Sequence, residues 1–184
     1  MDIVRIFEEK DTFWCTCYPE DDGKDILTVL MERWADRSYL QDFFKANLKD
    51  LQSPHWLGIS IEQAIDLVQQ EADFLYDKLF CIEHNLPGCT KVTVQDIFKP
   101  FKKYEYVINS FDKDNFVKGR LDTAPQFLRL YGIELDDGTI IISGGAIKLT
   151  SGMYPQHLKD ERKKLQELYQ YLNENEIDNI NGLN

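Results

Sequence analysis

Strand-like patterns occur only near the two ends of this chain, and helix-like patterns fill most of the sequence between them. Apolar and polar residues alternate over residues 2–7 and 13–18, and again over residues 127–135, which is the period of a strand. A parallel β-α-β fold needs strands that alternate with helices along the chain, so this order disfavours it. We expect an α+β fold in which a small antiparallel sheet packs against three to four helices.

Each end of the chain is expected to contribute a hairpin to this sheet. The first hairpin turns near residues 9–12. The second turns at residues 136–138, Asp-Asp-Gly, and continues into the β-branched run Thr-Ile-Ile-Ile-Ser at residues 139–143. Gly144 and Gly145 then interrupt the strand, which indicates a bulge or a close approach of another backbone.

Apolar residues repeat at helical spacing in four stretches, over residues 26–34, 39–51, 61–80 and 156–173. The third stretch begins with Ser60 and Gln63, which have the spacing of a reciprocal capping box. The pattern over residues 93–106 is ambiguous, and a short helix over residues 92–101 is one interpretation of it.

A chain of 184 residues suits one domain, which we place at residues 1–175, with a flexible tail at residues 176–184. Net charge is −11, but it is unevenly distributed. Residues 1–96 form an acidic, helix-rich half with 9 basic and 19 acidic side chains, whereas residues 97–164 carry 12 and 9. The hairpin-plus-helix half, residues 97–175, is therefore the part better suited to an anionic partner.

The sequence shows no run of about 20 apolar residues and no apolar signal core at its N-terminus. We therefore expect a cytoplasmic protein without a membrane partner. Four cysteines, unevenly spaced, favour reduced thiols over a disulfide framework. Zinc binding is the less favoured alternative, and its candidate ligands are Cys15, Cys17, Cys81, His84 and Cys89. We therefore expect neither a metal nor another cofactor.

The segment LRLYGIELDDGTIIISGGAIKLT, which ends at Thr150 and precedes a polar helix, resembles the C-terminal part of RelE/HigB-type toxins of bacterial toxin-antitoxin pairs. In that family an arginine-bearing strand pairs with an apolar strand, which leads into a G-x-K-x-T-like segment and a helix. The matching residues here are Arg129, Tyr131, Gly145, Lys148 and Thr150. The resemblance covers about 50 of 184 residues. This chain departs from the family in its acidity and in some 95 additional N-terminal residues.

The resemblance implies RNA cleavage through attack of a ribose 2′-hydroxyl on the adjacent phosphate, which needs a proton acceptor and cations. On that basis Arg129 and Lys148 are expected to supply positive charge, and Lys148 or His157 to transfer protons. The expected nucleic-acid-binding residues are Tyr131, Thr150, Arg162 and Lys163. The implied partners are RNA and a protein such as an antitoxin.

A non-functional interpretation of the same residues stays open. Arg129 also fits an outward-facing, ion-paired strand residue, and Lys148 fits the end of an exposed edge strand. The polar face of the last helix is most simply explained by intrahelical ion pairs. The alternative function is that of a non-catalytic interaction or regulatory domain that uses its acidic N-terminal half. The two functions differ in whether the basic residues converge in one concave site.

Overall fold

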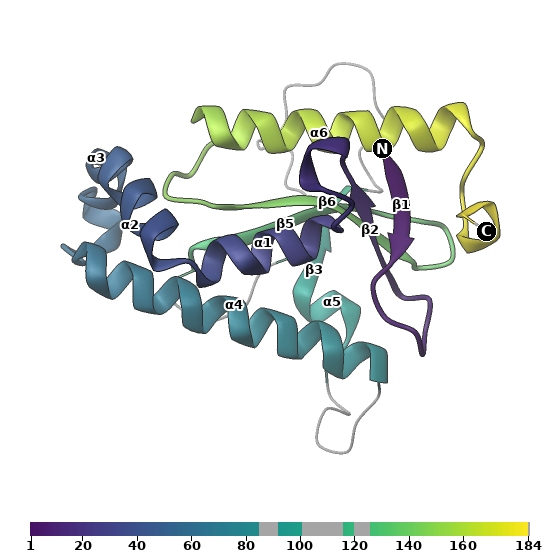
Figure 1. The fold of residues 1–184 in the computed structure, drawn as a ribbon, viewed down its shortest axis with the longest axis horizontal. Coiled ribbons are helices and arrows are strands. Elements are labelled where there is room, and N and C mark those ends of the chain that lie inside the picture. Colours follow the sequence, from purple (N-terminus) through teal and green to yellow (C-terminus); the bar gives the residue numbers. More distant parts are fainter. Residues whose placement is uncertain (85–91, 101–115, 120–125, 184) are drawn as a thin grey trace.

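The structure is a computed structural model that describes residues 1–84, 92–100, 116–119 and 126–183 (Figure 1). Its strands are β1 (Asp2–Arg5), β2 (Phe13–Cys17), β3 (Phe98–Pro100), β4 (Phe116–Gly119), β5 (Leu128–Glu134) and β6 (Ile140–Ile147). Its α-helices are α1 (Ile26–Ala35), α2 (Arg37–Ala46), α3 (Leu48–Leu51), α4 (Ile61–His84), α5 (Val94–Ile97) and α6 (Gln156–Glu174). Short 3-10 helices are η1 (Pro19–Asp21), η2 (Pro54–Trp56) and η4 (Ile180–Leu183).

The strands form one mixed sheet in the order β1-β2-β6-β5-β4-β3. β3 to β6 follow one another as an antiparallel meander, and β1 pairs antiparallel with β2. The two groups join where β2 runs parallel to β6, with Trp14 opposite Ile141. The α+β class and the packing of a sheet against helices are confirmed. The sheet is mixed where an antiparallel one was expected, because alternation identifies a strand but not the neighbour along its edge.

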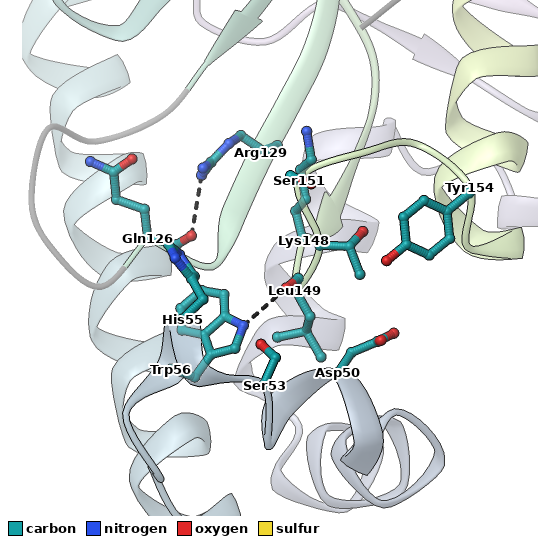
Figure 2. Close-up of a pocket in the computed structure, with 11 residues that line it drawn as sticks. Asp50, Ser53, His55, Trp56, Gln126, Arg129, Lys148, Leu149, Ser151 and Tyr154 are labelled. Carbon is teal, nitrogen blue, oxygen red and sulfur yellow. Dashed lines mark hydrogen bonds between the residues drawn. The ribbon is translucent and has the colours of Figure 1, made fainter.

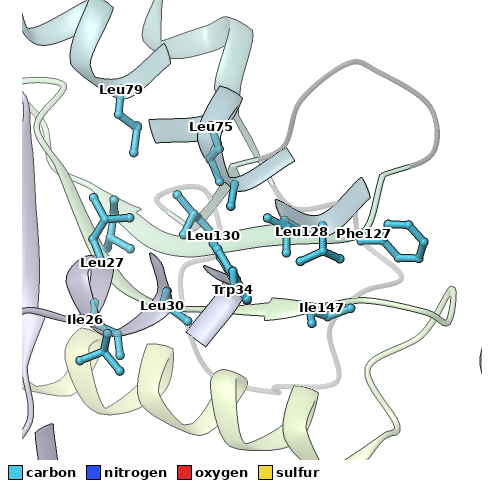
Figure 3. Packing of buried hydrophobic residues seen from close by; sticks show 14 of the residues in the cluster. Ile26, Leu27, Leu30, Trp34, Leu75, Leu79, Phe127, Leu128, Leu130 and Ile147 are labelled. Atoms are coloured by element: carbon cyan, nitrogen blue, oxygen red, sulfur yellow. The ribbon is translucent and has the colours of Figure 1, made fainter. Parts of the chain in front are cut away.

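Helices cover both faces of this sheet (Figure 1). α1 and α4 lie on one face, where Leu27, Leu75 and Leu130 belong to one apolar cluster (Figure 3). α6 lies on the other face, where Leu165 packs in a second cluster with Ile141. Every residue of β6 is consequently buried, as expected of a strand that is covered on both sides.

The start of α4 follows its predicted capping box. The Gln63 amide donates to Ser60 Oγ at 3.2 Å, and the Ser60 amide donates to Gln63 Oε1 at 3.0 Å. The segment that was ambiguous from the sequence divides into the short helix α5 and strand β3, and residues 101–106 lie outside the described residues. The capping box therefore fixes the residue at which α4 begins. That start determines which side chains of α4 face the sheet.

The C-terminal segment that was expected to be a flexible tail lies beside the β5–β6 turn (Figure 1). The Ile180 amide donates to Asp137 Oδ2 at 2.8 Å, and the Asp136 amide donates to the Asp178 carbonyl at 2.9 Å. Ile177 also packs against the apolar cluster under α6. Asp178 and Ile180 therefore form specific contacts with the β5–β6 turn, and Ile177 contacts the apolar cluster.

Replacement of Gly132 by alanine should destabilise the fold by about 3 kcal/mol, because the added methyl group meets rigid backbone. A Cβ atom at this position would lie 2.5 Å from the Ile141 carbonyl oxygen, at the register shift between β5 and β6. The matched control is Gly152→Ala, whose methyl group would meet the ring of Tyr154, a side chain that is 62% exposed and can move aside. Urea denaturation should show the larger loss for Gly132→Ala, and equal losses would contradict the steric argument.

Candidate functional site

The start of β5 and the end of β6 bring two basic side chains to the same face of the sheet. Arg129 lies opposite Ala146, and the Lys148 amide donates to the Phe127 carbonyl at 2.7 Å. Successive side chains of a strand alternate between faces, so Ala146 and Lys148 share the face on which Arg129 lies. Such diagonal neighbours are within reach of one another's long side chains.

Arg129 and Lys148 line one pocket of about 470 Å³ (Figure 2). Among the described residues, its walls come from the stretch from α3 to η2, the start of β5, and the end of β6 with the loop that follows it. The lining residues are Asp50, Ser53, His55, Trp56, Gln126, Arg129, Lys148, Leu149, Thr150, Ser151 and Tyr154.

Trp56 attaches the η2 wall to the two strands. Its indole stacks on the Phe127 ring, with ring centroids 4.3 Å apart and an interplanar angle of 7°. The indole Nε1 also donates to the Leu149 carbonyl at 2.9 Å. His55 meets the Trp56 ring edge-on, at a centroid distance of 4.8 Å. A rigid aromatic stack thus holds this imidazole at the pocket.

A buried carboxylate lies close to the arginine. Glu71, on α4, is 5% exposed and accepts hydrogen bonds from the Phe127 and Leu128 amides at 2.8 and 3.1 Å. Desolvation by burial raises the pKa of Glu71 to about 7, although these hydrogen bonds and the positive charge of Arg129 act to lower it. The charge of Glu71 therefore changes near neutral pH, next to the site.

Arg129 and Lys148 are the basic side chains in the described lining of the pocket. Arg129 is half-buried and donates to the Gln126 carbonyl, at 3.4 Å, and to the Leu128 carbonyl. Lys148 is 9% exposed. Among the described residues, the lining contains Arg129, Lys148 and one carboxylate, Asp50, and low exposure strengthens the interaction of such groups with a bound charge. Such a lining suits an anionic group with hydrogen-bond acceptors.

Three of the residues expected from the sequence lie in this pocket, because Thr150 joins Arg129 and Lys148 in its lining. Thr150 Oγ1 donates to the Gly152 carbonyl at 3.1 Å, which shapes the loop after β6. Sequence reasoning missed Asp50, His55 and Tyr154. Only the tertiary fold brings residues 50–56 to the hairpin, and the single hint was that His55 is one of three histidines in the chain.

Tyr131 does not lie in the pocket. It is 2% exposed and packs with Ala146 and Leu158 under α6, and its hydroxyl lies 3.6 Å from Met153 Sδ. We expected its face of the strand to be open, but α6 covers that face. The buried ring has no surface on which a nucleobase can stack.

His157, Arg162 and Lys163 also lie outside the pocket, on α6. His157 Nε2 lies 3.0 Å from the Ile147 carbonyl, and its ring meets Phe43 edge-on at 5.2 Å. Lys163 pairs with Glu167 at 3.3 Å on the exposed side of the helix. None of these three residues is therefore part of the pocket lining that contains Arg129 and Lys148.

The cysteines do not converge on a metal site within the described residues. Cys15 and Cys17 are free thiols, and burial is the main reason that the pKa of each is raised. Cys81 is disulfide-bonded, which corrects the expectation of a reduced thiol there. Cys89 lies outside the described residues. No group of three or more Cys, His, Asp or Glu side chains in the described part of the chain is arranged to hold an ion.

No helix among the described residues combines the length and apolarity needed to cross a membrane. Comparison with known proteins identifies no matching family, no similar curated protein and no similar solved structure.

Proposed function

We propose that the pocket binds a phosphate group of single-stranded RNA, and that the chain is a RelE/HigB-like protein acting on RNA in the cytoplasm. The observation that carries this proposal is the presence of Arg129, Lys148 and Thr150 in the lining of one polar pocket. Arginine offers paired donors to phosphate oxygens, and lysine adds a compact charge. The resemblance supplies the substrate class, and the pocket supplies a place for its phosphate.

The dimensions of the site support a single nucleotide unit as the bound group. A volume of about 470 Å³ falls within the range of small-ligand pockets. Tyr154 is 62% exposed at the edge of the pocket and offers a ring for base stacking, the role expected of Tyr131. RNA-binding proteins commonly read unpaired, splayed bases in this way.

His55 is the residue of the lining best suited to proton transfer in this chemistry. In the proposed step the imidazole accepts the proton of a ribose 2′-hydroxyl, and the 2′-oxygen forms a bond to the adjacent phosphorus. The bond from phosphorus to the 5′-oxygen breaks, and that oxygen leaves with a proton from the solvent. Arg129 and Lys148 stabilise the charge on the non-bridging oxygens.

The net charge of −11 opposes RNA at long range, but salt limits this effect. At physiological ionic strength, charges more than about 8 Å from the phosphate are largely screened. Binding then depends on the charged groups close to the phosphate, which in the described lining are Arg129, Lys148 and Asp50. We expect weak binding that falls steeply as salt is added.

The test is the binding of a single-stranded RNA oligonucleotide to the full chain, measured by fluorescence anisotropy. Arg129→Gln and Lys148→Gln should each weaken binding about tenfold, since each removes a charge-assisted contact of about 1.4 kcal/mol. The affinity of Arg129→Lys should lie between those of the unchanged chain and Arg129→Gln, because lysine keeps the charge and loses the paired donors. His55→Ala should retain binding and lower cleavage by about 10² or more.

The matched control is Arg5→Gln, which removes one exposed positive charge on β1 at the far edge of the sheet. It should bind RNA as the unchanged chain does. Growth on expression gives a second readout: inhibition should disappear in Arg129→Gln while the thermal unfolding midpoint is kept. Absence of RNA binding by the unchanged chain, or equal binding by all variants, would refute the proposal.

A second candidate is the non-catalytic interaction domain, with a protein such as an antitoxin as partner. A surface of the acidic N-terminal half favours it, because apolar and acidic side chains meet there between two helices. The helices of this half are also part of the core, which supports one domain in which they present a binding surface.

A further inference from the structure

A groove lies between α1 and α4, apart from the pocket around Arg129 and Lys148, and has a volume of about 980 Å³. We call it the α1–α4 groove, and among the described residues it shares no lining residue with the pocket around Arg129. The two helices pack against each other on the same face of the sheet (Figure 1). The described residues that line it are Ile6, Asp25, Leu27, Thr28, Met31, Glu32, Trp34, Ala35, Gln69, Ala72, Asp73, Tyr76 and Asp77.

The floor of the groove is apolar. Leu27, Trp34 and Ala72 form its base and belong to the main core cluster. Met31 is half-buried, and Tyr76 is 41% exposed although its ring packs 6.2 Å from that of Phe7. Met31 and Tyr76 therefore leave part of their apolar surface open beside this floor.

The rim of the groove is acidic on both sides. Asp25 and Glu32 come from the α1 side, Asp73 and Asp77 come from α4, and the described lining contains no lysine, arginine or histidine. Glu32 pairs with Lys24 at 2.7 Å. Within the described part of the chain, neither Asp73 nor Asp77 forms an ion pair, and like charges at this spacing destabilise a helix by a few tenths of a kcal/mol. A cation between these carboxylates would relieve their repulsion.

The residues of α4 that face the groove recur at helical spacing. Positions 69, 72, 73, 76 and 77 line one stripe of the helix, and α1 presents positions 28, 31, 32 and 35 opposite. A groove between two helices with an apolar floor has the form that receives the apolar face of a third helix. The acidic rim of the groove favours a helix whose side chains beside the apolar face are positively charged.

We infer that the α1–α4 groove is a docking site for a basic amphipathic helix of a partner protein. The apolar face of that helix covers Met31 and Tyr76, and lysine or arginine side chains on its flanks pair with Asp73 and Asp77. The inference is independent of the proposal for RNA, because the two sites share none of the described residues.

A synthetic peptide tests this inference with the full chain. The probe is a peptide of about 20 residues with leucine on one helical face and lysine on the other. Its controls are a scrambled sequence of the same composition and a version with glutamate in place of lysine. Isothermal titration at physiological salt should show binding of the basic amphipathic peptide and at least about tenfold weaker binding of both controls.

Two variants separate docking from plain charge attraction. Asp73→Lys/Asp77→Lys should weaken binding about tenfold or more, whereas Asp42→Lys/Glu174→Lys, with the same change in net charge on exposed residues outside the groove, should have under about threefold effect. Tyr76→Glu removes an apolar contact and adds a negative charge. It should weaken binding if the apolar floor receives the peptide.

Four results would overturn the inference: no binding of the basic amphipathic peptide, unchanged or stronger binding by Tyr76→Glu, equal binding of the scrambled peptide, or a dimer that excludes the peptide. Sedimentation velocity detects the last of these, since a second copy that covers the groove doubles the mass. RNA binding should also be measured on Asp73→Lys/Asp77→Lys. The two tests are separate, because this variant changes the groove and leaves the lining of the pocket around Arg129 unchanged.

Discussion

Residues 97–184, expressed without the preceding helices, should fail to fold. β5 and β6 bury Leu128, Leu130 and Ile142 in the same apolar cluster as side chains of α1 and α4, and removal of the N-terminal half returns this face of the sheet to water. At about 2 kcal/mol for each large apolar side chain, the loss for the whole face approaches the total stability of a domain, about 5–15 kcal/mol.

Removal of the N-terminal half also takes away β2, which pairs with β6. The edge of β6 would then be open to pairing with other chains, so aggregation is the expected outcome. Dispersion in a proton–nitrogen correlation spectrum and a cooperative thermal transition measure folding. The matched control is coexpression of residues 1–96 with 97–184, which should restore a folded pair. A segment 97–184 that folds alone would show that the acidic half is dispensable to the core.

Replacement of Glu71 by alanine should lower the free energy of unfolding by about 3 kcal/mol. The carboxylate accepts hydrogen bonds from the Phe127 and Leu128 amides, and alanine leaves both buried donors without an acceptor. It also leaves space at the junction of α4 with β5. Urea denaturation at pH 7 measures the loss. The matched control is the exposed α4 variant Glu62→Ala, which removes a surface ion pair with Arg37 and should lose under about 1 kcal/mol.

Stability should also depend on pH through Glu71. Burial raises its pKa from 4.5 to about 7, so between these values the folded chain binds a proton that the unfolded chain does not. The free energy of unfolding contributed by this group therefore rises as the pH falls from 7 to about 4.5, by about 3 kcal/mol in all, and is lowest above pH 7.

Glu71→Gln isolates this contribution, because glutamine stays neutral throughout. Burial also raises the pKa of Glu83 and Glu161, and those carboxyl groups remain in both proteins. The difference between the two stability curves should change across pH 4.5–7 and be flat above about 8. Parallel curves over the whole range would mean that Glu71 does not titrate near neutrality.

The limits of sequence reasoning are clearest at β5 and β6. The alternation around Arg129 and the turn at 136–138 predicted the hairpin, and the Gly144-Gly145 pair predicted an irregularity that occurs as the register shift beside Gly132. The same alternation suggested an open face for Tyr131, which α6 covers. Alternation indicates that the two faces of a strand differ in polarity. It does not indicate which element packs on either face.

Local patterns determined where the helices and hairpins of this protein form, because capping, turn chemistry and apolar spacing act within a few residues. Only the tertiary structure decided that β2 joins β6, that residues 50–56 line the pocket around Arg129 and Lys148, and that Glu71 accepts a hydrogen bond from the Phe127 amide. These contacts join residues tens of positions apart. They depend on which buried surfaces fit together. The fit between surfaces is determined by the packing of the whole chain, so no short stretch of the sequence predicts it.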